Sequence, residues 1–292
     1  MVGVTVVSTG WADLNVHYGP DAVPRSQTAA EAVAGARRLG YSAICLRAHG
    51  GSSVDVANAL DVAGGMRVYG GVTLNSPVGG LNPDAVALAL ATGGRIVALP
   101  TWSSPTETSR PRVAQTIVPV VDDGSPRPGL REVFAEVARH QAALDLGPVP
   151  SCELLGLIEL AQRAGVERIV VAHPFYRAQA YSDELVLQAA RAGAIIEHCF
   201  VQFHPDYPGR PDPARLVAQI DLVGPASVVL TGDSGLVGFP GIAGCLPAFA
   251  ELLAPHYSRA ELQRMLALTP LGLITPPDAA TSPVEPSERT VA

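Results

Sequence analysis

Short apolar runs alternate with amphipathic stretches along almost the whole of this 292-residue chain. An apolar run of roughly four to eight residues, bounded by turn residues, has the length of a buried β-strand. The stretches between the runs carry apolar residues at helical spacing, and such alternation is typical of repeated strand–helix units around a parallel sheet. We expect eight strands, at residues 12–18, 42–47, 67–74, 95–100, 142–146, 168–172, 194–199 and 227–231.

Helical stretches separate these strands, so that each strand reaches the next through a crossover. Eight strands with eight crossovers predict an α/β fold of the (β/α)8 TIM-barrel type, built as a single domain over residues 1–275. An open doubly wound sheet is the alternative, because a sequence does not reveal whether the first and last strands pair. The expected helices span residues 26–39, 54–63, 83–91, 130–139, 153–164, 183–191, 213–220, 246–253 and 258–266.

Two segments fall outside this repeat. Residues 101–126 form a connection that is longer than most βα loops and rich in Ser, Thr and Pro, which predicts a flap over the active site. The alternative is a surface excursion with a small hairpin around the sequence QTIVPVVDD. Residues 276–292 have no apolar pattern and contain four Pro, so we expect a disordered C-terminal tail.

The charge balance and the hydropathy exclude several kinds of partner. The net charge is -7, the isoelectric point is about 5.5 and no basic cluster is present, which argues against nucleic-acid binding. The N-terminus lacks a basic segment followed by an apolar one, and no apolar run approaches the roughly 18 residues that span a bilayer. We therefore expect a cytoplasmic protein without a membrane partner.

The basic residues and the cysteines restrict the chemistry further. All 20 basic residues are Arg, so the chain has no lysine for a Schiff base, for PLP or for a carbamylated metal bridge. The cysteines are scattered without a CxxC pair, which predicts reduced thiols rather than a zinc knuckle or a disulfide framework. They are Cys45, Cys152, Cys199 and Cys245.

Polar residues gather at the expected carboxyl ends of the strands, where barrel enzymes build their active sites. Several of them are histidines, and imidazole serves both as a general acid or base and as a metal ligand. The alternative role of each histidine is structural, as a hydrogen-bonding partner, and the alternative role of Asp233 is that of an N-cap. The catalytic candidates are His17, His49, His173, His198 and Asp233.

A second set of strand-end residues is suited to substrate binding. Arg47 would hold an anionic substrate through its guanidinium group, unless it pairs with Asp13 or Glu197. Together the set suggests a small molecule with an anionic or amide group and a flat portion. The candidates are Asn15, Arg47, Asn75 and Trp102.

Six sequence blocks are more specific than the general repeat: DLNVHYGPD, VYGGVTLNSPVGGLNPDAV, GRIVALPTW, GVERIVVAHPFY, AIIEHCF and VVLTGDSG. In this combination the chain resembles the amidohydrolase superfamily of TIM-barrel metal-dependent hydrolases, and in particular an uncharacterised branch marked by the motif DLHVHxGPD. The resemblance extends over residues 13–274. It implies the barrel fold and a site in which one or two divalent ions activate water.

The resemblance also implies a set of metal ligands. Members of the superfamily use a His-x-His pair on the first strand, histidines at the ends of strands five and six, and an aspartate on strand eight. His17 matches the second histidine of the pair, His173 matches strand six, and Asp233 matches strand eight. These three residues are the metal ligands that the resemblance assigns to this chain.

Three positions of the superfamily pattern are altered. Asn15 stands in place of the first histidine, Pro148 occupies the strand-five position, and residues 47–49 read Arg-Ala-His where Lys-x-His is usual. An amide oxygen is a poor zinc ligand, proline has no donor atom, and the guanidinium cation repels a metal ion. We therefore expect at most one divalent ion, which would be zinc, iron or manganese, or none.

Three classes of function remain open. The first is a hydrolase that acts on a C–N or related bond of a small molecule with the help of one metal ion. The second is a metal-independent lyase, cyclase or isomerase of specialised metabolism that uses His, Asp and Arg in acid–base chemistry. The third is a catalytically inactive ligand-binding barrel. The sequence leaves the oligomeric state open, with a homodimer among the alternatives.

Overall fold

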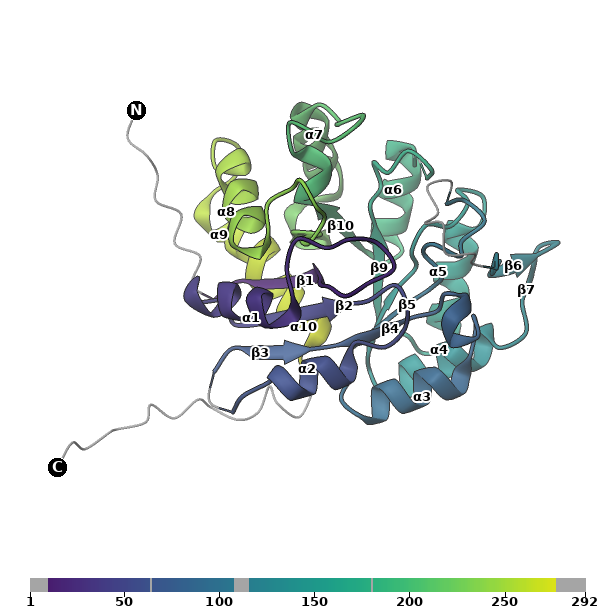
Figure 1. Ribbon diagram of the computed structural model, residues 1–292. Helices are drawn as coiled ribbons and strands as arrows, with labels where there is room; N and C mark the ends of the chain where they lie inside the picture. The colour runs from purple at the N-terminus through teal and green to yellow at the C-terminus, as the bar shows by residue number, and fades with distance from the viewer. Residues whose placement is uncertain (1–9, 64, 108–115, 180, 277–292) are drawn as a thin grey trace.

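The computed structural model describes residues 10–63, 65–107, 116–179 and 181–276, and its main strands are parallel and surrounded by helices (Figure 1). A strand is found at each of the eight expected places, and the α/β class is thereby confirmed. The strands are β1 (Ala12–His17), β2 (Ala43–Arg47), β3 (Arg67–Tyr69), β4 (Gly71–Thr73), β5 (Ile96–Ala98), β8 (Ala143–Asp145), β9 (Arg168–Ala172), β10 (Ile195–Cys199) and β11 (Val228–Thr231).

The strands lie in two parallel sheets, in the orders β1-β2-β3 and β4-β5-β8-β9-β10-β11. The expected single strand at 67–74 is divided between them at Gly70. A Cβ at Gly70 would lie 2.7 Å from the Cα atom of Val54, so the start of helix α2 (Val54–Leu60) packs directly on the backbone there. This close approach bends the chain, and β3 pairs with β2 while β4 pairs with β5.

Backbone bonds also link β1 to the segment that follows β11. The amide of His17 donates to the carbonyl of Ser234 at 2.9 Å, and the amide of Ser234 donates to the carbonyl of Asn15 at 3.2 Å. The carboxylate of Asp13 accepts from the amide of Gly232 in the same region. The first and the last strand of the series are therefore in contact.

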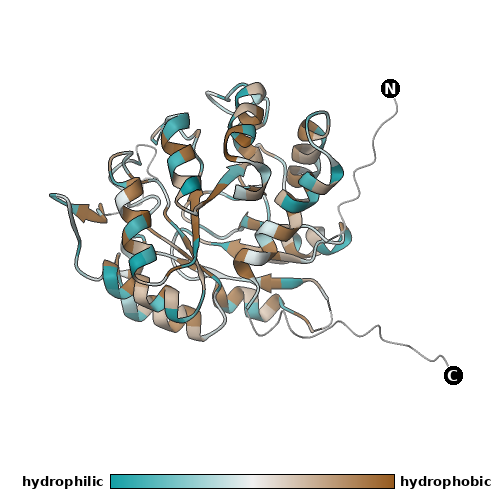
Figure 2. Ribbon diagram, turned by 180° about the vertical axis from the view of Figure 1, so that it is seen from behind, coloured by the Kyte–Doolittle hydropathy of each residue, from teal (hydrophilic) through white to brown (hydrophobic). Residues whose placement is uncertain are grey.

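Helices cover the outer side of the strands, and Figure 2 shows hydrophobic colour along the strands and hydrophilic colour on much of the helices. They begin at suitable caps; Thr28 and Ser258, for example, each form a capping box with a glutamate three residues later. The remaining long helices are α1 (Ala29–Arg38), α3 (Pro83–Ala91), α4 (Leu130–Arg139), α5 (Leu154–Arg163), α6 (Asp183–Arg191), α7 (Pro213–Val223) and α8 (Ile242–Leu253).

The C-terminal helical region differs from the expected helix at 258–266. It consists of α9 (Arg259–Gln263), the π-helical turn η4 (Arg264–Leu268) and α10 (Thr269–Ile274). Leu273 and Ile274 of α10 belong to an apolar cluster with the first residues of several strands, such as Ala43 and Ile96. This helix therefore covers the amino ends of the strands and leaves polar groups to the carboxyl ends.

The connection between β5 and α4 lies partly outside the described residues, because 108–115 are not among them. Its described part contains a two-stranded antiparallel hairpin, formed by β6 (Val121–Asp122) and β7 (Ser125–Pro126). The hairpin that we expected around QTIVPVVDD is thus present, but it lies at the end of this stretch. Of the expected C-terminal tail, 277–292 are also outside the described residues. Within the described part, no helix has the length and apolarity to traverse a bilayer.

Candidate active site

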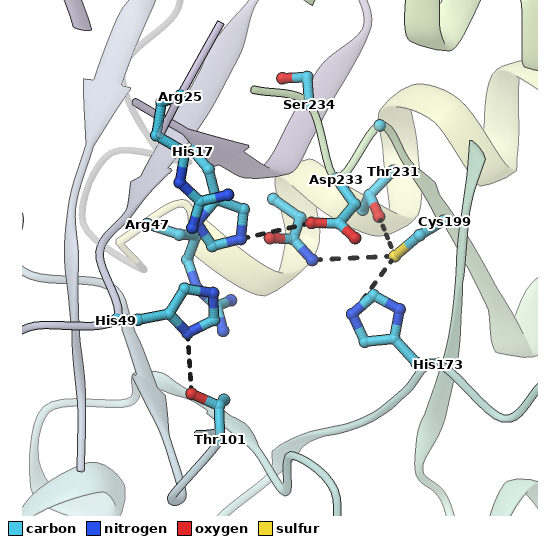
Figure 3. Close-up of polar contacts among 12 residues, drawn as sticks. His17, Arg25, Arg47, His49, Thr101, His173, Cys199, Thr231, Asp233 and Ser234 are labelled. Atoms are coloured by element: carbon cyan, nitrogen blue, oxygen red, sulfur yellow. Dashed lines mark hydrogen bonds and ion pairs between the residues drawn. The ribbon is translucent and has the colours of Figure 1, made fainter. Parts of the chain in front are cut away.

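The strands deliver a group of polar side chains to their carboxyl ends, and Figure 3 shows several of them facing one another. His17 is the last residue of β1, Cys199 is the last residue of β10, and His173 and Asp233 follow β9 and β11 by one and two residues. Because β9, β10 and β11 are neighbours and β11 is linked to β1, these four residues converge on one place.

His173, Cys199 and Asp233 form the tightest part of this group. One potential ligand atom from each lies within 4.8 Å of the other two, and the Cys199 Sγ is 3.8 Å from the His173 Nε2. A thiol, an imidazole and a carboxylate are all common zinc ligands. This tightest part thus contains two of the three residues that the resemblance assigned to a metal, together with a cysteine.

Both His173 and Asp233 have a left-handed backbone conformation, with φ values of 54° and 49°. Such a conformation costs residues other than glycine on the order of 1–3 kcal/mol and tends to occur where function requires a side chain in one direction. The amide of His173 donates to the carbonyl of Glu197, which holds the strained turn against β10. The strain therefore aims both side chains into the cluster.

His17 contacts the same aspartate from the other side. Its Nε2 lies 3.3 Å from the Asp233 Oδ1, and its side chain is almost completely buried. Burial lowers the pKa of His17, while the hydrogen bond to Asp233 opposes that shift. Burial raises the pKa of Asp233, but the hydrogen bond from His17 and the charge of His173 outweigh it, so the pKa lies below its ordinary value. The aspartate is therefore held as a carboxylate.

Three stacked rings form one wall of the site. His17 stacks on His49 with 4.6 Å between ring centroids, and His49 stacks on Trp102 with 4.1 Å between centroids. The Nδ1 of His49 is 2.8 Å from the Thr101 Oγ1, which fixes the plane of the ring. Burial lowers the pKa of His49 well below its ordinary value, and the neighbouring His17 adds to that effect. The wall is thus flat and its central ring is neutral.

The Cys199 side chain is completely buried and lies among hydrogen-bonding partners. Its Sγ is 3.0 Å from the Thr231 Oγ1, and the Asn15 Nδ2 donates to it at 3.8 Å. Burial raises the pKa of this thiol, and the carboxylate of Glu197 raises it further. A thiol with a raised pKa is a poor nucleophile. Cys199 is therefore unsuited to covalent catalysis by itself.

Asn15 occupies the centre of this group of contacts. Besides its bond to the sulfur, its Nδ2 donates to the Glu197 Oε1 at 3.4 Å. The Asn15 Oδ1 is buried, and it has no hydrogen-bond partner among the residues that the structure describes. Buried polar atoms are nearly always paired, so this oxygen is available to a ligand.

Arg47 has a different partner from those that we expected. Its Nη2 lies 2.5 Å from the Asp145 Oδ2, and both side chains are buried. The alternative to substrate binding, a direct pairing with Asp13 or Glu197, is wrong, because the guanidinium contacts the carboxylate at the end of β8 instead. Glu197 still acts on the guanidinium through its charge, and burial raises the pKa of that carboxyl. Arg47 is therefore committed to an internal ion pair.

Asn75 uses its whole amide within the protein. Its Nδ2 donates to the carbonyl of His49 and to the Thr101 Oγ1, and its Oδ1 accepts from the amides of Thr101 and Ser103. An asparagine side chain has two donor hydrogens and two acceptor lone pairs, and all of them are used. Asn75 therefore positions the segment that carries Trp102 rather than offering groups to a substrate.

His198 does not join the cluster. Side chains alternate along a strand, and while Glu197 and Cys199 contact Asn15, the ring of His198 stacks on Phe175 at 5.6 Å between centroids. It is completely buried, and burial lowers its pKa to about 3. The structure thus separates His198 from the other four catalytic candidates.

Cys199 is the residue of this site that sequence reasoning missed. The signal was present, because Cys199 is the last residue of an expected strand and lies two residues after Glu197. Residues two apart on a strand face the same side. A single cysteine without a CxxC partner has no local pattern that indicates a metal ligand.

The altered strand-five position has a structural role. The carbonyl of Pro148 accepts hydrogen bonds from the hydroxyls of Ser104 and Thr106. The 101–107 segment after β5 is thereby fastened to the loop after β8. The side chain of Pro148 itself has no atom that binds a metal ion.

Comparisons with known proteins agree with this architecture. A family model described as a family of unknown function (DUF6282) matches residues 10–197. No curated protein matches the sequence. An amidohydrolase from Pseudomonas aeruginosa is similar in structure, with a TM-score of 0.64 and 12% identity over 91% of this chain and 96% of that one.

Two further solved structures extend the comparison. A 2,6-dihydroxybenzoate decarboxylase from Rhizobium has a TM-score of 0.56 and 12% identity, over 91% of this chain and 98% of its own. A variant N-acetyl-D-glucosamine-6-phosphate deacetylase from Mycobacterium smegmatis has a TM-score of 0.56 and 15% identity, over 92% of this chain and 78% of its own. These matches confirm the resemblance to the amidohydrolase superfamily at the level of the fold.

Proposed function

The chain belongs to the family of unknown function DUF6282, and we propose that it is an enzyme of amidohydrolase type that hydrolyses a C–N or related bond of a small molecule at this cluster. The observation that carries the proposal is the convergence of His173, Cys199 and Asp233, two of them on strained backbone. A fold without a site at this position has no need to store such strain.

A closed (β/α)8 barrel fits this function, because it would gather all the strand ends around one cavity. Two observations support closure. The bonds of His17 and Ser234 link the first strand to the segment after the last. In addition, one apolar cluster contains residues from strands on both sheets, including Leu14, Tyr69 and Val229. Those residues would form the inner layer of the barrel.

The donor set fits one divalent ion and does not fit two. Of the superfamily ligands, His173 and Asp233 remain and Cys199 lies beside them, whereas Asn15 and Pro148 supply no strong donor. An ion held at this set would act as a Lewis acid and lower the pKa of water toward neutrality. This matches the expectation of at most one metal.

The surrounding side chains have separate tasks in this proposal. Asp233 accepts the proton of the attacking water, because its carboxylate faces the cluster and its side chain is 24% exposed. His17 holds that carboxylate in place through its Nε2. The unpaired Oδ1 of Asn15 accepts a hydrogen bond from the substrate.

The wall formed by His17, His49 and Trp102 favours a substrate with a planar portion. A flat ring system stacks on aromatic faces with little loss of conformational entropy. Arg25 lies over the Trp102 ring, with 6.0 Å from its Cζ to the centroid, and its charge is balanced by an ion pair with Asp21, so it extends the planar wall without adding net charge. A planar amide, lactam or aromatic carboxylate derivative fits such a wall.

The second candidate function is metal-independent acid–base catalysis as a lyase, cyclase or isomerase. The observation that favours it is the contact between His17 and Asp233, a base–orienter pair that needs no metal to form. The two candidates therefore differ in their response to metal removal.

The test is a turnover screen of the full chain against planar amides, lactams, lactones and aromatic carboxylates, with Zn²⁺, Mn²⁺ or Fe²⁺ and with chelator. Metal-dependent hydrolysis that falls on the order of 10³-fold or more in Asp233→Asn supports the proposal. The exposed Asp84→Asn is the matched control and keeps full activity. Turnover that survives chelation supports the second candidate, and saturable binding without any turnover contradicts both in favour of a ligand-binding barrel.

A further inference from the structure

Cys199 lies where a metal ion would contact it. It ends β10 on the face that it shares with Glu197, its side chain is completely buried, and its sulfur is directed at the His173 Nε2 in Figure 3. The other cysteines in the described part of the chain do not lie in such a cluster, since Cys45 and Cys245 bond to backbone carbonyls and Cys152 is exposed. The position of this thiol is therefore specific.

We propose that Cys199 is a metal ligand, and that His173, Cys199 and Asp233 hold a single zinc ion with one coordination position open. The inference rests on the proposed function for the location of the site, and adds a ligand on a strand that supplies none in the superfamily pattern. On binding, the thiol proton leaves to solvent as the sulfur–zinc bond forms. Two anionic ligands then balance the double charge of the ion.

The distances agree with tetrahedral coordination. Zinc–sulfur and zinc–nitrogen bonds of about 2.3 and 2.1 Å at a tetrahedral angle place sulfur and nitrogen about 3.6 Å apart. The Cys199 Sγ and His173 Nε2 are 3.8 Å apart, and the carboxylate of Asp233 lies within 4.8 Å of both. Small side-chain rotations are enough to form the site.

One neighbour of the sulfur is suited to stabilise a thiolate. The Asn15 Nδ2 donates a hydrogen bond to it at 3.8 Å, whereas the Thr231 hydroxyl, 3.0 Å from the sulfur, donates its single proton to the Glu197 Oε1 at 2.7 Å. Partners of this kind orient metal ligands and contribute to affinity. Asn15, which replaces the first histidine of the superfamily pair, thus supports the ligand that compensates for that histidine.

His17 lies outside the donor set in this arrangement. Its Nε2 approaches the Asp233 Oδ1 and is not among the ligand atoms that lie within 4.8 Å of one another. It therefore acts as a positioning residue for the carboxylate. The ligand set proposed here differs from the set implied by the resemblance in one residue, because Cys199 takes the place of His17.

The thiolate also determines which metal binds. Soft sulfur ligands favour zinc over manganese and magnesium, which prefer oxygen. A site of one thiolate, one imidazole and one carboxylate with an open position has the composition of a catalytic zinc centre.

The experiment measures metal binding rather than turnover. Metal-free full-length protein is titrated with Zn²⁺ against a chromophoric chelator, and with Co²⁺ while the near-ultraviolet absorption is recorded. A thiolate–cobalt bond gives a charge-transfer band that nitrogen and oxygen ligands do not give. The variants are Cys199→Ser and His17→Ala, with the exposed Cys152→Ser as the control, and thermal unfolding shows that each is folded.

We expect one zinc per chain, a cobalt charge-transfer band, and a fall in zinc affinity on the order of 100-fold or more in Cys199→Ser. Cys152→Ser matches the wild type, and His17→Ala keeps the stoichiometry and the band. Wild-type protein without the band, or Cys199→Ser with unchanged affinity, overturns the inference without any need for the variant to be active. A zinc site with these properties in a protein that turns over no substrate would instead contradict only the proposed function.

Discussion

Asp13 makes the stability of this protein depend on pH in a direction that is unusual for a carboxylate. It lies in β1, completely buried, and its carboxyl accepts hydrogen bonds from the backbone amides of Asn15 and Gly232. Burial, helped by the charges of Glu197 and Asp233, raises its pKa to about 7 against the effect of these two bonds. The group therefore keeps its proton in the folded state at mildly acidic pH.

The sign follows from proton binding. Between pH 3.8, the ordinary pKa of the group, and about pH 7, the folded state holds a proton that the unfolded state has lost. The contribution is fully present below the unfolded pKa and is lost as the pH rises through the folded pKa. At 1.36 kcal/mol per pKa unit, raising the pH from 5 to 8 removes about 3 kcal/mol of unfolding free energy.

The assay compares the wild type with Asp13→Asn, in which the side chain is neutral at every pH. Urea unfolding of both proteins at pH 5 and pH 8, in the same chelator-containing buffer, gives the difference in unfolding free energy between wild type and variant at each pH. The contributions of all other titrating groups cancel in these differences. We expect the advantage of the wild type to shrink by about 3 kcal/mol between the two pH values. The exposed Asp55→Asn is the control and shows no such change. Equal differences at both pH values would refute the reasoning.

Two further predictions concern the framework beneath the site. Asp145→Leu lowers the unfolding free energy by about 3–5 kcal/mol, because it leaves the Arg47 guanidinium buried without its carboxylate. The double variant with Arg47→Met recovers most of this loss, and urea unfolding measures both variants. If the losses of the two single variants add in the double variant, the pairing is contradicted. Gly235→Ala destabilises by about 2 kcal/mol or more, because φ is 106° and a Cβ would lie 2.2 Å from the carbonyl oxygen of His17. Gly224→Ala is the control, because Gly224 also has a positive φ but a Cβ there lies in open space, so this variant measures only the cost of the backbone conformation. Equal losses of unfolding free energy in the two variants would contradict a contribution from the contact with His17.

Much of the fold was predictable because it depends on local composition. Apolar runs of strand length and helical stretches of suitable spacing gave every main strand and most helices within a few residues. The errors lie where tertiary contact overrides local pattern. Gly70 divides an apolar run because Ser53 and Val54 press on its backbone, and a contact between segments so far apart in the chain has no local signature.

The candidate site was predictable only in part, for a related reason. Strand ends converge in any parallel α/β fold, so His17, His173 and Asp233 were expected together and lie together. Which way a strand-end side chain faces depends on register, and this separated His198 from Cys199. The partners of a buried polar group are equally non-local, which is why neither substrate binding nor the alternative pairing with Asp13 or Glu197 anticipated the ion pair of Arg47 with Asp145.

Electrostatics explains why one thiol in this position can compensate for a histidine lost on another strand. A dication in a buried site is stable only when nearby groups neutralise it. The set implied by resemblance, His17, His173 and Asp233, offers one anion, whereas the exchange of His17 for Cys199 offers two. The neutral amide of Asn15 donates to the sulfur without adding a further cation, as a protonated imidazole would. In the proposed zinc site, Asn15 and Cys199 therefore act together, because the amide supports the sulfur that supplies the second anion.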